Sequence, residues 1–298
     1  MRVEWPTLSL IAASYMALLV GLFWLPLISL WLAVPVLILV ITLQSSLQHE
    51  VLHGHPFAWR WPGEALVFAS FNLFVPYIRF RDTHLAHHHD ANLTDPYDDP
   101  ETAYLDPAVW ARLPSWYQGV LTANNTLLGR VILGPLIGQI AFMANDLRAI
   151  RGGDKAVLFG WLWHIPVAAL LVALVISAPL PLWAYFCACY GGLGLLKIRT
   201  FLEHQAHMRA SARSVIIEDR GPLAFLFLNN NLHVVHHMHP RLPWYRLPAH
   251  YRANRDRYLT RNGGYAYPNY AAIARRHLLS TKEPVAHPHY PGPAAPQK

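Results

Sequence analysis

The sequence predicts an all-α integral membrane protein in which two hairpins of transmembrane helices carry a cytoplasmic helical cap. Of its 298 residues, 54% are hydrophobic and only 14% are charged, whereas a soluble protein of this length carries about 25% charged residues. Two apolar runs, each long enough for a pair of bilayer-crossing helices, contain no lysine or arginine. These observations place the chain among membrane proteins before any motif is considered.

The first apolar run extends from Thr7 to Leu47 and is interrupted only at Trp24–Leu25–Pro26. Because about 20 residues cross a bilayer as a helix, this run predicts spans over 7–25 and 27–47. A cleaved signal peptide is the competing interpretation. The stretch is too long for one, lacks a small-residue cleavage site and passes directly into the second span. We therefore expect an uncleaved hairpin.

The second apolar run predicts spans over 156–176 and 181–200, separated by the Ser177–Pro181 turn. All 24 lysines and arginines lie outside the inner parts of the two hairpins, and neither turn carries one. By the positive-inside rule both turns face away from the cytoplasm. We expect a multi-pass protein of an inner or plasma membrane, with both termini in the cytoplasm.

Two further stretches, Glu64–Ile78 and Leu121–Met143, are short or contain polar residues that are unfavourable in lipid. We expect both to be interfacial or half-buried helices. The net charge of +7 is explained by topology and by attraction to anionic lipid, and it does not indicate a nucleic-acid partner. One domain is predicted over 1–283, followed by a proline-rich disordered tail over 284–298.

Histidine is the anomaly in this composition, with 18 residues. In each of two HxxHH triplets, three imidazoles project from one face of a helix. Two further groups, HEVLH and EHQAH, directly follow predicted spans, so the expected topology puts all four groups at the cytoplasmic membrane face. Neutral imidazoles that converge are ligands for a transition metal. The best-placed members give nine candidate ligands: His49, His53, His84, His87, His88, His204, His233, His236 and His237.

Nine imidazoles are too many for one metal ion, since a tetrahedral site takes four ligands, and the count therefore predicts two metal ions. Nitrogen ligands exclude Ca²⁺ and Mg²⁺, which prefer oxygen, and leave iron, zinc, copper or nickel. His207 is the alternative to His204. The acidic stretch Asp95–Glu101 is expected to be a capped loop. Residues next to the ligands are candidates to orient the imidazoles, namely Glu50, Asp90, Glu203 and Asn231.

HEVLH also matches the HExxH motif of zinc proteases, in which two histidines bind Zn²⁺ and the glutamate acts as general base. Some membrane-embedded proteases use this motif. A protease would need one further downstream ligand and would leave both HxxHH triplets without a role. The sequence therefore favours a centre with two metal ions.

The set HEVLHGH, RDTHLAHHHD, EH and NLHVVHHMHP resembles the histidine boxes of the membrane-bound fatty acid desaturase superfamily. That superfamily also includes alkane monooxygenases, lipid hydroxylases and carotenoid ketolases. The resemblance covers the region from Ile41 to Tyr245. It implies two iron ions in a non-haem di-iron centre, held by the nine histidines named above at the cytoplasmic ends of four transmembrane helices.

The resemblance also implies an oxidoreductase that reduces O₂ with two external electrons and abstracts hydrogen from an unactivated C–H bond. Such a bond is too weakly acidic for acid–base catalysis, so a metal-bound oxidant is required. The electron donor must be a separate protein, such as ferredoxin or a cytochrome. We expect desaturation of a fatty acyl lipid, with hydroxylation or ketolation of a lipid or carotenoid as the alternative. A non-enzymatic metal sensor or channel remains as a third possibility.

Overall fold

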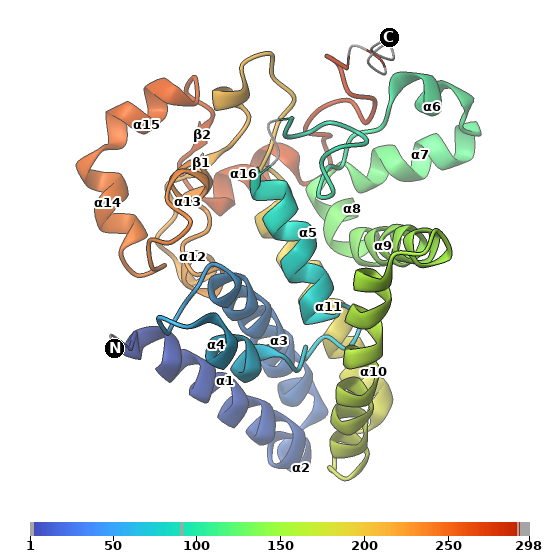
Figure 1. The fold of residues 1–298 in the computed structure, drawn as a ribbon, viewed down its shortest axis with the longest axis vertical. Helices are drawn as coiled ribbons and strands as arrows, with labels where there is room; N and C mark the ends of the chain where they lie inside the picture. Colours follow the sequence, from blue (N-terminus) through green and yellow to red (C-terminus); the bar gives the residue numbers. More distant parts are fainter. Residues whose placement is uncertain (1–2, 90–91, 291, 293–298) are drawn as a thin grey trace.

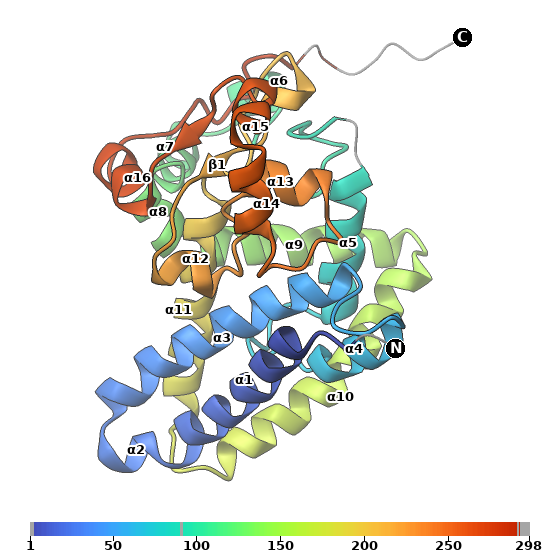
Figure 2. The same ribbon diagram turned by 90° about the vertical axis from the view of Figure 1, so that its left-hand side faces the viewer.

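A computed structural model describes residues 3–89, 92–290 and 292, and these residues are mostly helical (Figure 1). The long helices lie together at one end of the molecule, and shorter helices form a cap at the other (Figures 1 and 2). The first half of the apolar end consists of α1 (Trp5–Phe23), α2 (Leu25–Ile28) and α3 (Leu30–Leu52). The second half consists of α10 (Lys155–Ile176) and α11 (Leu182–Thr200).

Among the described residues, three segments are long and apolar enough to cross a membrane: Trp5–Ile28, Leu30–Leu52 and Lys155–Ile176. They correspond to three of the four predicted spans. The fourth predicted span is the helix α11, but Lys197 and Arg199 occupy its last turn and lower its hydropathy. A fourth crossing therefore stays a prediction.

Close packing of α11 against α3 joins the two predicted hairpins. A Cβ atom added to Gly192 of α11 would lie 2.8 Å from Ile41 Cγ2, and one added to Gly191 would lie 2.5 Å from Ile38 Cδ1. Only a residue without a side chain allows the two backbones to approach this closely. This packing carries the end of α3, with His49 and His53, close to the end of α11 and so positions two of the four histidine groups.

The two predicted interfacial helices are each divided in the structure. The first stretch is split between α4 (Arg60–Val67) and the start of α5 (Tyr77–His89), because Asn72 Oδ1 accepts the backbone N–H groups of Phe74 and Val75 and closes a turn. The second is split among α7 (Ser115–Asn124), α8 (Leu127–Ile132) and α9 (Gly134–Arg151), with α6 (Pro107–Arg112) before them. None of these helices is long and apolar enough to span a membrane.

The cap is held together by a two-stranded parallel sheet. Strand β1 (Ile216–Ile217) pairs with β2 (Ala266–Tyr267). The N–H of Val234 donates to Val215 O, which ties the third histidine segment to this sheet. The remaining cap elements are η1 (Ala210–Ala212), α12 (Pro222–Leu226), α13 (His233–Met238), α14 (Leu247–Ala253), α15 (Arg255–Arg261) and α16 (Tyr270–His277).

The first described residues of the predicted tail make backbone hydrogen bonds to the loop around Leu105. Leu105 N–H donates to Val285 O at 2.9 Å, and His287 N–H donates to Leu105 O at 2.8 Å. His287 is buried, and its Nε2 lies 3.1 Å from Thr94 Oγ1. Proline-rich composition indicates disorder, but a short extended segment needs only a partner strand, and the loop around Leu105 supplies one. Positions 291 and 293–298 of the predicted tail lie outside the described residues.

Replacement of His287 by alanine is therefore expected to lower the free energy of unfolding by about 1–3 kcal/mol, since it removes a buried hydrogen bond and leaves the Thr94 hydroxyl without this partner. The measurement is thermal or denaturant unfolding in detergent. His289→Ala is the matched control, because His289 is exposed. Equal stability of the two variants would show that the tail contact contributes nothing.

Candidate metal centre

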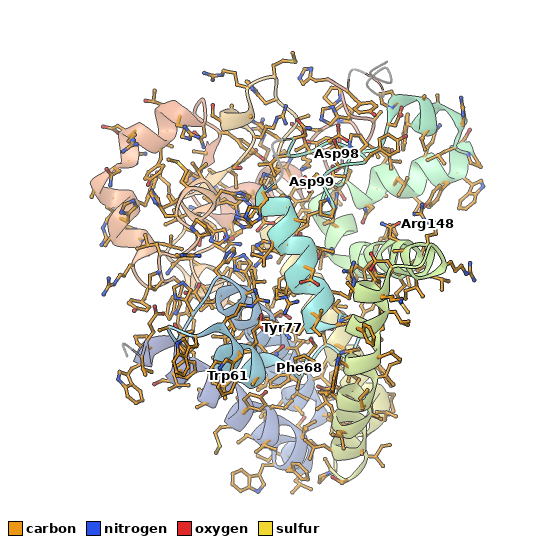
Figure 3. All side chains as sticks on the ribbon, in the orientation of Figure 1. Trp61, Phe68, Tyr77, Asp98, Asp99 and Arg148 are labelled. Atoms are coloured by element: carbon orange, nitrogen blue, oxygen red, sulfur yellow. The ribbon has the colours of Figure 1, made fainter. Side chains whose placement is uncertain are left out.

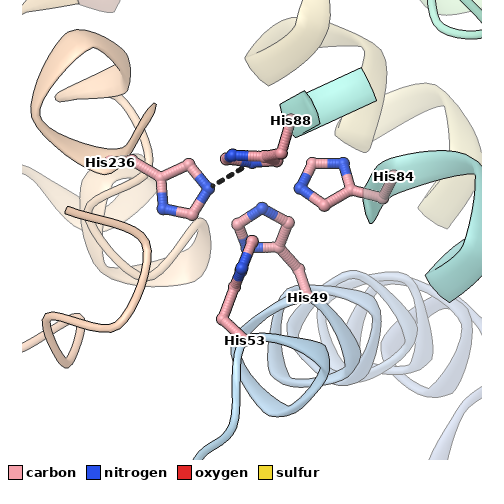
Figure 4. Close-up of side chains that lie close together, drawn as sticks. All are labelled: His49, His53, His84, His88 and His236. Atoms are coloured by element: carbon pink, nitrogen blue, oxygen red, sulfur yellow. Dashed lines mark hydrogen bonds between the residues drawn. The ribbon is translucent and has the colours of Figure 1, made fainter. Parts of the chain in front are cut away.

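The nine predicted ligands form two groups. A five-histidine group consists of His49, His53, His84, His88 and His236 (Figure 4), and a four-histidine group consists of His87, His204, His233 and His237. In each group the candidate ligand atoms all lie within 4.8 Å of one another. Segments that are far apart in sequence thus meet at one place between the long helices and the cap.

Each HxxHH triplet is divided between the two groups. On α5, His84 and His88 are one helical turn apart and join the five-histidine group, while His87 joins the other. On α13 the division is reversed, because His233 and His237 join the four-histidine group and His236 joins the five-histidine group. The two groups are therefore adjacent, and the rings of His88 and His237 stack at 4.2 Å across their boundary.

The Nε2 atoms of the histidines converge. In the four-histidine group, Nε2 of His204 lies 2.9 Å from that of His87 and 3.0 Å from that of His233. In the five-histidine group, three buried Nε2 atoms have no hydrogen-bond partner among the described residues, those of His49, His53 and His84. Buried polar atoms without partners are unfavourable. One metal ion in each group would satisfy these nitrogens, so the residues fit two metal ions.

In four of the nine histidines the opposite ring nitrogen, Nδ1, has a hydrogen-bond partner. His87 Nδ1 lies 2.7 Å from Asp99 Oδ1, and His84 Nδ1 lies 2.9 Å from Glu101 Oε1. A carboxylate accepts, so Nδ1 carries the proton and the Nε2 lone pair is left for a metal. His233 Nδ1 lies 3.2 Å from Asn230 Oδ1, and His204 Nδ1 lies 3.2 Å from Ser214 Oγ.

The acidic stretch forms the expected capped loop, in which Asp95 Oδ1 accepts the N–H groups of Tyr97 and Asp98. Asp99 and Glu101 do shape a loop, but they also hold two of the candidate ligands, and Figure 3 shows Asp99 beside the end of α5. Neither residue adjoins a histidine in sequence. The only signal for them is an unusually dense acidic run a few residues after the second histidine box, and such a run is equally typical of a capped loop.

Of the two glutamates predicted to orient ligands, Glu203 lies near a candidate ligand and Glu50 does not. Glu203 accepts from Asn230 Nδ2 at 3.3 Å, forms an ion pair with Arg199 at 3.2 Å and lies 3.8 Å from His233 Nδ1. Glu50 accepts from the backbone N–H of Trp244 at 2.9 Å, which ties the first histidine box to the loop after the third. Glu50 thus joins two chain segments and is not bonded to one of the nine ligands.

The other two candidates differ from expectation or are not described. The Nδ2 group of Asn231 donates to Ile217 O at 2.6 Å and to Asp219 O at 3.1 Å. Asn231 therefore fixes the strand β1 and does not orient an imidazole, because its side chain points to the sheet. Asp90 lies outside the described residues. Asn230, the residue beside Asn231, occupies the role that Asn231 was expected to have.

Electrostatics leave most of these imidazoles neutral. Burial, together with the neighbouring His84, lowers the pKa of His88 to about 3. Burial and the neighbouring His87 lower the pKa of His204 to about 3. Burial also opposes the charge on His87, but the hydrogen bond to Asp99 and the charge of Glu101 outweigh it and raise the pKa of His87 to about 9. Neutral imidazole is the form that binds metals, so a metal ion bound at His87 would displace the proton on Nε2.

His204 is the histidine that the structure places in the four-histidine group, and His207 is not in either group. His207 Nδ1 instead accepts the backbone N–H of Arg209 at 3.0 Å. We expect His204→Ala to lose metal from the four-histidine group and His207→Ala to retain it, as measured by metal analysis of the purified variants. If His207→Ala lost metal and His204→Ala retained it, His207 would be the ligand in place of His204.

The protease interpretation of HEVLH requires His49 and His53 to share a metal with a carboxylate or one further ligand. They lie instead in a group with three other histidines, and that group contains no carboxylate among the described residues. The arrangement of the site therefore favours the two-metal centre.

The chain is similar to known proteins over most of its length. The family model described as "Fatty acid desaturase" matches residues 22–269, which include all nine histidines. A beta-carotene ketolase of Paracoccus sp. (strain N81106 / MBIC 01143) is 26% identical over 228 residues, and the match covers 74% of this chain and 74% of the relative.

Proposed function

The chain belongs to the fatty acid desaturase family, and on that premise we propose that it is a membrane-bound di-iron enzyme that introduces a double bond into a fatty acyl lipid. Membership of the family and similarity to a ketolase make it an oxygen-dependent oxidoreductase. Iron as the metal, a fatty acyl lipid as the substrate and a double bond as the product are the parts that we propose. The observation that carries it is the division of nine histidines into two adjacent groups.

The five-histidine group would hold one iron ion and the four-histidine group the other. When bound, the two ions supply the redox chemistry that activates O₂ toward an unactivated C–H bond, which side chains alone do not provide. The protein's contribution is to fix the ligands. The helices α5 and α13 each contribute to both groups, so a shift of either helix would disturb both ions together.

Asp99 and Glu101 complete this arrangement on the side away from the metals. They accept the Nδ1 protons of His87 and His84, which fixes the ring orientation and makes each imidazole a stronger ligand. The reaction also requires two electrons. The chain has no cytochrome-like haem motif or CxxC cluster, so we propose a separate donor such as ferredoxin or a cytochrome.

A second candidate is ketolation of a carotenoid. It is favoured by the similarity to the Paracoccus beta-carotene ketolase over about three quarters of both chains. Both reactions begin by removal of hydrogen from a C–H bond of a lipid-like substrate, and they differ in the step after that removal. The same nine histidines would serve either reaction.

Expression of the full chain in two bacterial hosts, one with ordinary phospholipids alone and one that also makes β-carotene, would test the proposal. We expect new unsaturated acyl chains in the lipid extract of both hosts. New ketocarotenoids in the second host, with acyl chains unchanged, would select the second candidate. If neither product appears while the expressed protein binds two metal ions per chain, both proposed reactions are wrong.

We also propose that both termini and the metal centre face the cytoplasm. All lysines and arginines lie outside the turns of the two apolar hairpins, which is the distribution that the positive-inside rule assigns to this orientation. Cysteine labelling of intact cells would test it: a cysteine placed in the Ser177–Pro181 turn should react with an impermeant reagent, and one placed beside His289 should not.

A further inference from the structure

The helix α5 supplies candidate ligands to both histidine groups, yet little apolar packing holds it in place. His84 and His88 belong to the five-histidine group, and His87 belongs to the four-histidine group. Three residues of α5 are buried, namely Tyr77, His84 and His87. Tyr77 is therefore the single buried residue of this helix that is not a candidate ligand. Directional polar contacts are needed to fix the position of such a helix along its axis.

The first turn of α5 forms a bidentate ion pair with α9. Arg79 Nε donates to Asp146 Oδ2 and Arg79 Nη2 donates to Asp146 Oδ1, both at 2.9 Å. The Nε1–H group of Trp161, on α10, donates to the same Oδ2 atom at 2.8 Å. Asp146 is 4% exposed. Two parallel hydrogen bonds between planar groups fix their relative orientation as well as their separation.

The helix α10 leaves room for the Arg79 side chain. A Cβ atom added to Gly160 would lie 2.9 Å from Arg79 Cδ and 3.1 Å from Arg79 Cγ, so a larger residue there would push the arginine aside. Arg81, two residues later, contacts Glu64 of α4 through one nitrogen at 3.3 and 3.4 Å. These bonds are longer than those of Arg79, and the contact with α4 therefore constrains α5 less.

The same two helices also hold the loop that leads into α5. Gln139 Nε2, on α9, donates to Phe74 O at 2.9 Å. His164 Nε2, on α10, lies 2.9 Å from Leu73 O, and because a carbonyl accepts, this nitrogen carries a proton. Figure 1 shows the start of α5 beside α10. The start of α5 is thus bonded to α9 and α10, while its end is bonded to the acidic loop.

A buried ion pair contributes little net stability, because the loss of hydration offsets the attraction between the charges. A bidentate pair does provide a fixed geometry. We propose that Arg79 and Asp146 are positioning residues, whose ion pair sets the position of α5 and so holds the candidate ligands of both histidine groups in place. A helix is rigid over a few turns, so a shift at Arg79 reaches all three histidines of α5. This inference rests on the proposed metal centre.

The test starts from the full-length, iron-loaded protein and follows the loss of iron to an added chelator. The double variant Arg79→Met/Asp146→Asn removes both charges together, and the amide oxygen at position 146 can still accept from Trp161. No buried charge is left unpaired, so the variant should fold. We expect iron to be lost roughly tenfold faster from both histidine groups, which is the lower end of the effect of losing an orienting partner. The two components of the oxidised Mössbauer spectrum report the two groups.

Two single substitutions complete the test. Arg79→Lys keeps the charge but contacts one carboxylate oxygen in place of two. It should speed iron loss from both groups by a smaller factor, and it decides the question if the double variant fails to fold. Asp154→Ala is the control, because Asp154 caps α10 by accepting the N–H groups of Ala156 and Val157. It should lower the melting temperature and leave the rate of iron loss unchanged.

Iron loss at the unchanged rate from either histidine group would overturn the positioning role. Equally fast loss in Asp154→Ala would also overturn it, since a general loss of stability would then explain the effect. If the unchanged protein itself holds fewer than two iron ions, the proposed metal centre fails. That result is distinct from failure of the positioning role, in which the unchanged protein and the double variant both hold two ions equally firmly.

Discussion

Replacing His233 with alanine is expected to abolish product formation and to lower the metal content from about two ions per chain toward one. His233 Nε2 lies 3.0 Å from the Nε2 atoms of both His204 and His237. The substitution therefore removes a candidate ligand that lies beside two others in the four-histidine group. We expect the rate of product formation to fall by more than about a hundredfold, which exceeds the usual effect of losing an orienting partner. Metal analysis and lipid extraction of the same preparation measure both effects.

His239→Ala is the matched control for this substitution. His239 follows the same helix α13, but its ring packs on His250 and it belongs to neither histidine group. It should keep both metal ions and full activity. If the His233 variant kept its metal content and its product, the assignment of the third histidine box to a metal would be wrong.

Replacing Asp99 with asparagine is expected to weaken metal binding in the four-histidine group by about ten- to a hundredfold. One oxygen of Asp99 accepts from His87 Nδ1 at 2.7 Å and the other accepts from the backbone N–H of Thr94 at 2.8 Å. Asparagine has a single oxygen, so its amide N–H₂ must face one of these donors. Metal titration of the metal-free protein measures the loss, and added iron should restore part of the activity.

Asp98→Asn is the control for the adjacent position, because Asp98 is exposed and its carboxylate makes no hydrogen bond among the described residues. Its metal affinity should equal that of the unchanged protein. Equal affinities of the two asparagine variants would show that Asp99 shapes the loop without acting on His87. Restoration of activity by iron in the Asp99 variant distinguishes a positioning role from a direct part in the reaction.

The candidate ligands are predictable from sequence because helical periodicity determines them. Spacings of three and four residues put His84, His87 and His88 on one side of α5, and the apolar runs before HEVLH and EHQAH indicate a common membrane face for these two groups. The division of each triplet between two groups is not predictable in this way. It depends on how α5 and α13 cross, and that crossing is set by tertiary packing that a single sequence does not encode locally.

The partners of the imidazoles are harder to predict for the same reason. Asp99 lies 12 residues after His87, on a loop whose path no periodic pattern describes. Asn231 is close to His233 in sequence, but backbone geometry turns it toward β1 and gives the orienting role to Asn230. Helical periodicity predicts which neighbours in sequence come into contact only within a helix. Both asparagines precede the first residue of α13, so periodicity does not predict which of them contacts His233.

The sequence predicts a long helix well where apolar composition alone identifies it. Three predicted spans correspond to long apolar helices of the structure. The helix α11 is the exception, because it combines close-packing glycines with Lys197 and Arg199 in its last turn. Its contribution lies in close contact with α3, and this contact is visible only in three dimensions.

The central claim is that nine histidines hold two adjacent metal ions in one centre. Anaerobic titration of the metal-free protein with Fe²⁺, followed by oxidation and Mössbauer spectroscopy, tests it most directly. We expect binding that saturates at two iron ions per chain and an oxidised spectrum with two components, one for each histidine group. Saturation at one ion per chain would contradict it.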